Sequence, residues 1–166
     1  QRDAEPAPPL GKPTDWPSPW GGDPGASKFS TLNQINTQNV KNLTVAWTYD
    51  TGYSTNDQYQ HSPCAIDNVI YLPSGRGTNV LALQGDTGKE LWKQRIGGSF
   101  SASPVVCKGM IYVPNLSGET IVFEAKGDAY HEVARNQLGN DSYASVAVSG
   151  NELFMRVGVG EGNERK

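Results

Sequence analysis

The chain has 166 residues, of which 36% are hydrophobic, 19 are glycine and 11 are proline, and its formal net charge at pH 7 is −3. This slightly acidic balance, without a cluster of basic residues, argues against nucleic acid or an anionic membrane surface as a partner. No apolar run approaches the roughly 20 residues of a transmembrane helix. No signal peptide is recognisable, which is also expected of an exported protein whose signal has been removed.

Residues 1–24 hold seven of the eleven prolines and show no periodic pattern of apolar residues. Such a composition favours an extended arm rather than a packed element. We therefore predict a proline-rich arm over residues 1–24 and a folded part over residues 25–166.

Three similar hairpin patterns begin at Ser62, Ser103 and Ser145, at steps of 41 and 42 residues. In each, two short runs rich in apolar residues flank a two-residue turn, which is typical of a β-hairpin. A period near 40 residues with strand patterns only indicates the blades of a β-propeller. The sequence therefore predicts an all-β fold, with four-stranded antiparallel blades. About three blades fit this length, fewer than the four to eight of a closed propeller, so we predict an open arc.

A second marker keeps the same period and ends in glycine: it starts at Trp47, Trp92 and Ala134, at steps of 45 and 42 residues. We interpret each run as the outermost strand of a blade, followed by the loop that crosses to the next blade. The predicted blades cover about residues 62–97 and 103–139, with an outer strand at 43–50 before them and an incomplete blade at 144–166. The predicted strands lie near residues 43–50, 63–66, 69–73, 79–83, 90–96, 103–107, 110–114, 120–124, 131–137, 144–148 and 152–157.

The segment before the first hairpin carries a set of short motifs in a fixed order. These are Trp16-Pro, Gly21-Gly-Asp, Phe29-Ser-x-Leu-x-Gln-Ile-Asn and Asn39-Val-x-x-Leu-x-x-Ala-Trp. In order and spacing they resemble the amino-terminal entry of quinoprotein dehydrogenases, which use pyrroloquinoline quinone (PQQ). The resemblance is clear over about residues 15–95.

The same family has a tryptophan-docking motif, Ala-x-Asp-x-x-Thr-Gly-x-x-x-Trp, and this chain matches it with Ala82, Thr87, Gly88 and Trp92, but has Gln84 at the first Asp. The resemblance implies that the indole of Trp92, and that of Trp47 before it, wedges between neighbouring blades and buries a large surface. In the next repeat Ala134 stands at the position of the tryptophan. Residues 99–157 resemble the final blades of non-catalytic PQQ-like repeat proteins, of which an outer-membrane assembly lipoprotein is one relative.

The resemblance also implies where a cofactor contact would lie. In the alcohol-oxidising quinoproteins, an acidic residue three positions before the proline of the first inner strand contacts PQQ. That position is Gln60 here, so the carboxylate is missing. The other parts of the family site, a cysteine pair, an arginine, calcium ligands and a catalytic aspartate, have no recognisable counterpart in this chain. We therefore predict no catalytic residue, and Gln60 is the only candidate for a cofactor contact.

Other candidates for chemistry are weaker. His61 and His131 lack further ligands at the spacing of a metal site, so we predict no metal site. Arg76 lies in a glycine-rich stretch that could hold an anion, although a plain loop between two strands is the simpler interpretation. Cys64 and Cys107 fall two positions apart in the repeat, which argues against a disulfide between them.

Three functional hypotheses remain open. We favour a non-catalytic PQQ-like propeller segment that serves as a scaffold or binding surface. The first alternative is a fragment of a PQQ-dependent dehydrogenase that oxidises an alcohol or sugar, with its PQQ and calcium sites in other sequence. The second is a structural unit that pairs with the remaining blades, or with another copy of the chain, through open sheet edges. In each case we expect a periplasmic or secreted protein, and no activity from this chain alone.

Propellers of this family commonly complete one blade from both chain ends, which here would join residues 43–50 to the strands of 144–157. The strand that should lie between them is missing from the pattern. Two complete blades of ordinary curvature would also hold the two halves apart. We therefore expect that residues 43–50 do not pair with residues 152–157 of the same chain, and that both ends of the arc expose unpaired edges.

Overall fold

The computed structural model describes residues 15–16, 28–30, 32–53, 61–74 and 78–160. Within them are ten β-strands and one 3₁₀ turn, Val40–Asn42, and no helix that is both long and apolar enough to cross a bilayer. The strands form two four-stranded sheets and one two-stranded sheet, and every pairing is antiparallel. The predicted all-β class and blade pattern are thus confirmed.

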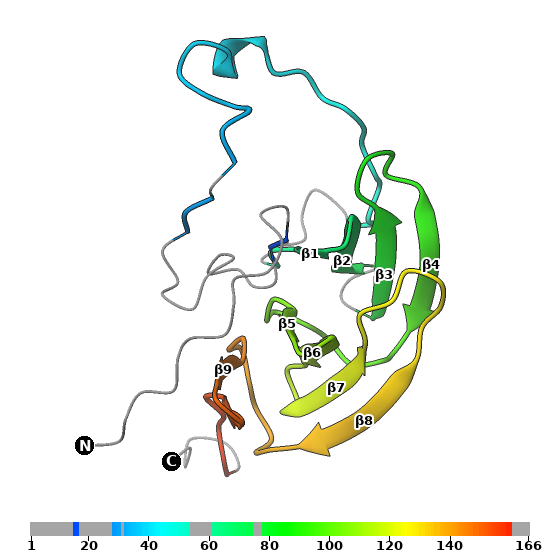
Figure 1. The fold of residues 1–166 in the computed structure, drawn as a ribbon. Helices are drawn as coiled ribbons and strands as arrows, with labels where there is room; N and C mark the ends of the chain where they lie inside the picture. Colours follow the sequence, from blue (N-terminus) through cyan, green and yellow to red (C-terminus); the bar gives the residue numbers. More distant parts are fainter. Residues whose placement is uncertain (1–14, 17–27, 31, 54–60, 75–77, 161–166) are drawn as a thin grey trace, which may run out of the picture.

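Each four-stranded sheet is a blade whose strands follow one another from the innermost to the outermost (Figure 1). The first blade consists of β1 (Cys64–Ile66), β2 (Val69–Ser74), β3 (Asn79–Gln84) and β4 (Glu90–Arg95). The second consists of β5 (Val105–Cys107), β6 (Met110–Pro114), β7 (Glu119–Glu124) and β8 (Glu132–Gln137). A third sheet pairs only β9 (Ala147–Ser149) with β10 (Glu152–Phe154), so its two strands are shorter than predicted.

Each inner hairpin of the two blades has the predicted two-residue turn, and both turn residues have positive φ angles. Asp67 and Asn68 have φ angles of 49° and 61°, and Lys108 and Gly109 have φ angles of 50° and 74°. Two successive residues in the left-handed region match the right-handed twist of the flanking strands. This geometry fixes the register, which pairs Ile66 with Val69 across the first turn.

The main hydrophobic core lies between the first and second blades. Side chains at alternate positions of one blade meet those of the other, because successive residues of a strand point to opposite faces. The fully buried aromatic residues Tyr71 and Phe123 are the largest members of this core. The core consists of Cys64, Tyr71, Val80, Ala82, Ile96, Phe100, Ile111, Val113, Ile121 and Phe123.

The predicted outer strand at residues 43–50 is wrong as a strand. The structure assigns no strand between residues 43 and 53. A strand needs a hydrogen-bonded neighbour, and no backbone hydrogen bond joins residues 44–53 to another described residue. The segment is attached by side chains instead, since Trp47 and Tyr49 pack against Leu72, Leu81 and Leu83 of the first blade.

The sheets do not close into a ring. As expected from the sequence, no backbone hydrogen bond in the described part of the chain joins residues 43–50 to β10. Among the described strands, only β9 pairs with β10, and β4 and β8 each have one unpaired edge. The fold is therefore an open arc of blades (Figure 1).

The serines that mark the repeat connect one blade to the next. The N–H of Ser62 donates to Oγ of Ser103 over 2.9 Å, and the N–H of Ser103 donates to Oγ of Ser145 over 2.9 Å. The hydroxyl of each following repeat thus satisfies the backbone donor of the repeat before it. This ladder explains why a serine recurs at the start of each inner hairpin.

We expect Ser103→Ala to lower the free energy of unfolding by about 1 kcal/mol, because it leaves the N–H of Ser62 without its acceptor. Ser62→Ala is the matched control. The hydroxyl of Ser62 accepts no such bond in the described part of the chain, so its removal should change stability by less than about 0.5 kcal/mol. Urea unfolding followed by circular dichroism measures both variants. Equal losses in the two variants would contradict the ladder.

Candidate functional site

The indole of Trp92 lies at the junction of the first and second blades. Trp92 belongs to β4 and pairs with Ala82 of β3. Its N–H donates to the carbonyl of Lys126 over 3.0 Å, in the turn that follows β7 of the next blade. Its ring centroid lies 5.9 Å from that of Tyr71 in its own blade. The ring therefore touches one blade while its polar tip is bound by the next.

The second blade supplies an aromatic pocket for this indole. The ring centroids of Phe123 and Tyr130 lie 5.9 Å and 5.7 Å from that of Trp92, and both pairs meet edge to face. Edge-to-face packing suits the charge distribution of aromatic rings and adds to the burial of apolar area. Trp92 itself remains partly exposed.

Trp47 makes the same kind of contact with the first blade. Its indole N–H donates to the carbonyl of Gly85 over 3.0 Å, in the turn that follows β3. Tyr49, two residues later, is hydrogen-bonded through its hydroxyl to the carboxylate of Glu90. Burial, followed by this carboxylate, raises the pKa of Tyr49 to about 12, which keeps the hydroxyl protonated as the donor. Two successive indoles thus reach the turn between the third and fourth strands of the following blade.

The turn from β3 to β4 explains why the motif needs its particular residues. Gly88 has a φ angle of 69°, and a Cβ atom there would lie 2.5 Å from Cε3 of Trp47. Oγ1 of Thr87 accepts the N–H of Lys89 over 3.3 Å inside the turn. Ala82 is fully buried opposite Trp92, where a longer side chain would have no room. The small residues of the motif therefore make space for the two indoles.

In the second blade, alanine replaces the tryptophan of this contact. Ala134 of β8 pairs with Val122 of β7, as Trp92 pairs with Ala82 in the first blade. An alanine has no ring with which to reach the following hairpin. Oγ1 of Thr120 lies 3.6 Å from Sδ of Met155, and Oγ of Ser142 donates to the carbonyl of Arg156 over 3.1 Å.

The loop that would lead to a cofactor is only partly described. Gln60 lies outside the described residues, as does Arg76. His61 is buried, and its Nε2 donates to the carbonyl of Phe100 over 2.5 Å. Burial lowers the pKa of His61, while this hydrogen bond acts in the opposite direction. The histidine thus ties the entry of the first blade to that of the second.

The described residues contain no group of three or more His, Cys, Asp or Glu side chains that could hold a metal ion. His131 is exposed in the segment that leads into β8. Both cysteines are free thiols, as the repeat offset predicted. Cys64 is fully buried, and burial raises the pKa of its thiol to about 12, so it is a small core residue.

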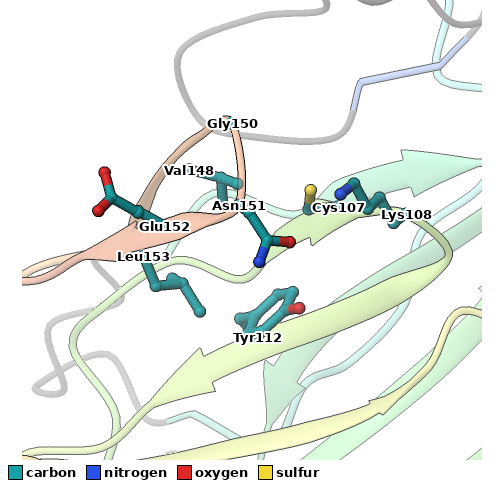
Figure 2. A pocket seen from close by; sticks show the side chains of 8 residues that line it. All are labelled: Cys107, Lys108, Tyr112, Val148, Gly150, Asn151, Glu152 and Leu153. Carbon is teal, nitrogen blue, oxygen red and sulfur yellow. The ribbon is translucent and has the colours of Figure 1, made fainter.

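A shallow cavity of about 110 Å³ lies between the inner hairpins of the second and third sheets (Figure 2). Its lining includes Cys107, Lys108 and Tyr112 from one hairpin, and Asn151 and Leu153 from the other. Binding sites for cofactors and other small organic molecules usually measure about 300 to 1,000 Å³. The cavity is therefore too small for a cofactor of several fused rings.

Comparison with known proteins supports this architecture. Residues 16–138 match the family model described as "PQQ: Glucose/ethanol/alcohol dehydrogenase, beta-propeller domain". Quinate/shikimate dehydrogenase (quinone) of Acinetobacter baylyi is 32% identical over 130 residues, which cover 70% of this chain and 16% of that protein. The lanthanide-dependent methanol dehydrogenase of Methylorubrum extorquens is 39% identical over 82 residues, which cover 49% of this chain and 13% of that protein.

Among solved structures, the quinohemoprotein alcohol dehydrogenase of Comamonas testosteroni superimposes with a TM-score of 0.71 at 24% identity. The match covers 87% of this chain and 23% of that structure. The chain spans only about one sixth of the length of the curated relative first compared. The match of the family model to residue 138 also corrects the sequence interpretation, in which the dehydrogenase resemblance weakened after residue 95.

Proposed function

Because the chain belongs to the PQQ family of glucose, ethanol and alcohol dehydrogenase β-propellers, we propose that it supplies scaffold blades to such a propeller. Its role is to hold neighbouring blades in place. The chemistry of the whole protein, oxidation of an alcohol or sugar with PQQ and a metal ion, belongs to sequence outside this chain. The observation that carries the proposal is the repeated indole contact, in which Trp47 and Trp92 each reach the next blade.

The two indoles act as docking groups in this proposal. Each combines apolar contact in the junction with one directional hydrogen bond to a backbone carbonyl. The hydrogen bond fixes the position of the ring, and the apolar contact supplies most of the free energy. Together they set the distance and angle between consecutive blades, on which the shape of the complete propeller depends.

The described residues do not fit PQQ or its metal ion. Calcium binds six to eight oxygen ligands, largely from carboxylates and amides, and the described part of the chain gathers no cluster of carboxylates that could begin such a site. The cavity beside Cys107 is far below the volume of a cofactor site. We therefore assign no step of a reaction to these residues.

The third sheet shows where further blades would join. Leu153 faces Tyr112 of the second blade across the shallow cavity (Figure 2). Phe154, the next residue, must point to the opposite face, and its side chain is 53% exposed. The equivalent residue of the first blade, Tyr71, is 1% exposed because the second blade covers it. Another blade of the longer protein would cover Phe154 in the same way.

A second candidate function follows from the same open edges. In the absence of further blades, β10 and the outer edges of β4 and β8 can pair with strands of another copy, so the chain would act as an assembly unit. We also propose that the protein is exported to the periplasm or the medium. Cell fractionation of the host, with antibodies against this chain, tests that location, and recovery only in the cytoplasm would contradict it.

The scaffold proposal is tested with a dye-linked dehydrogenase assay. The purified chain is incubated with PQQ and Ca²⁺, then given ethanol, glucose or quinate, with a reconstituted complete PQQ dehydrogenase as the positive control. We expect the rate of dye reduction to equal that of the blank without protein. The longer gene product that contains this chain should reduce the dye with at least one of these substrates. Turnover by the isolated chain would contradict the scaffold role.

A further inference from the structure

The inner edge of the first blade is the only inner edge in the described part of the chain that has a partner. The N–H of Trp16 donates to the carbonyl of Ala65 over 2.7 Å, and the N–H of Ala65 donates to the carbonyl of Trp16 over 2.8 Å. The two residues form an antiparallel bridge. The partner is therefore Trp16, which precedes the folded blades in the sequence.

The register of the hairpin explains why Ala65 is available. A two-residue turn makes Ile66 and Val69 a hydrogen-bonded pair, so the next pair, Ala65 with Ile70, is a non-hydrogen-bonded pair. The N–H and C=O of Ala65 therefore point away from β2, toward the axis of the arc. A single residue of another segment can use both groups at once, and Trp16 does so.

The side chain next to this bridge adds a second, independent attachment. Oδ1 of Asp15 accepts the N–H of Asp67 over 3.1 Å. Asp67 is the first residue of the turn from β1 to β2 and has a positive φ angle. Its N–H is thus bound by the arm rather than by a strand. Asp15 and Trp16 are both partly buried against the hairpin.

The inner edge of the second blade can be compared with that of the first. Val106 occupies the position of Ala65 in β5, and the same register, with Cys107 opposite Met110, turns its backbone groups to the axis. No described residue forms a backbone bridge with Val106. The two blades are otherwise alike in strand order and pairing. The arm therefore distinguishes the first blade from the second.

We propose that Asp15 and Trp16 together form a strap that covers the axial edge of β1 in the first blade. Asp15 lies at the Asp67–Asn68 turn, and Trp16 is bridged to Ala65 in the antiparallel sense. An exposed strand edge is a template for pairing with another chain, and covering it with a loop is one way in which native proteins prevent this. The strap thus keeps the axial side of β1 inaccessible to other chains.

Amide hydrogen exchange measured by NMR tests the strap in the full chain. After correction for intrinsic rates, the amides of Ala65 and Asp67 should exchange at least about tenfold more slowly than that of Val106, because hydrogen bonds to the arm protect them. A variant without residues 1–14 should keep this protection. Removal of residues 1–24 should bring Ala65 to the rate of Val106, while amides of β3 stay protected and show that the blade is still folded.

A point variant separates the two attachments. Asp15→Ala should speed the exchange of Asp67 and leave Ala65 protected by the backbone of Trp16. Equal rates for Ala65 and Val106 in the full chain would overturn the proposal. Protection of Ala65 that is lost on dilution would also overturn it, because the strap would then come from a second copy.

Discussion

Replacing Trp92 by alanine is expected to lower the free energy of unfolding by about 3 kcal/mol. The change removes a large aromatic side chain that contacts Tyr71, Phe123 and Tyr130. Truncation of tryptophan in protein cores costs about 3 to 5 kcal/mol, and the partial exposure of Trp92 places the expected loss at the lower end. Such a loss is a large part of the roughly 5 to 15 kcal/mol that stabilises a typical domain.

A second variant of Trp92 separates the hydrogen bond from the ring contacts, and a control variant accompanies it. Trp92→Phe keeps an aromatic ring in the junction but removes the N–H donor to the carbonyl of Lys126, so it should cost about 1 kcal/mol for the hydrogen bond, with a further loss from the smaller ring. Val133→Ala, at an exposed position of β8, serves as the control and should change stability by less than about 0.5 kcal/mol. Urea unfolding followed by far-UV circular dichroism avoids dependence on tryptophan fluorescence. If the Trp92→Ala variant were as stable as the wild type, the indole would not contribute to holding the two blades together.

The second large effect is expected for Gly88→Ala. An alanine at this position has to adopt a left-handed φ angle, which costs about 1 to 2 kcal/mol. Its Cβ would also lie 2.5 Å from Cε3 of Trp47, so the indole must move out of its contact. Overpacking of this kind costs about 1 to 3 kcal/mol more. We therefore expect a total loss of about 2 to 5 kcal/mol.

Gly97→Ala is a matched control for this variant. Gly97 has a φ angle of 77°, close to that of Gly88, but a Cβ atom there would meet nothing within 4 Å. It should lose only the cost of the backbone conformation, about 1 to 2 kcal/mol. The difference between the two variants measures the contact with Trp47. Equal losses would mean that the Trp47 contact adds nothing to the stability of the first blade.

Much of this architecture could be predicted from the sequence because the repeat is carried by local signals. The turn dipeptides Asp67-Asn68 and Lys108-Gly109 fix the registers of two inner hairpins, and the spacing of Ser62, Ser103 and Ser145 fixes the period. These signals depend on neighbouring residues, so they can be interpreted without knowledge of the fold.

The errors arose where structure depends on distant partners. Residues 43–50 have the composition of a strand, but a strand exists only with a hydrogen-bonded neighbour, and no described segment supplies one. The serine ladder could have been inferred from the recurrence of Ser103 and Ser145, yet the sequence does not show that hydroxyls accept the backbone N–H of the preceding repeat.

The bridge between Trp16 and Ala65 joins residues about fifty positions apart and has no periodic signal. Only the resemblance to quinoprotein dehydrogenases indicates Gln60 as a candidate cofactor contact. It lies outside the described residues, so its role stays a prediction.

The central claim is that the chain forms an open arc. Its unpaired strand edges and the exposed side chain of Phe154 are available for contact with further strands. Size-exclusion chromatography with multi-angle light scattering, over a range of protein concentrations, tests it most directly. Exposed edges of β4, β8 and β10, together with the exposed side chain of Phe154, should favour pairing between copies. We predict a weight-average mass that rises above the 17.9 kDa of one chain as the concentration increases. A compact particle of 17.9 kDa at every concentration would contradict the account, because it would mean that these few blades close their own edges.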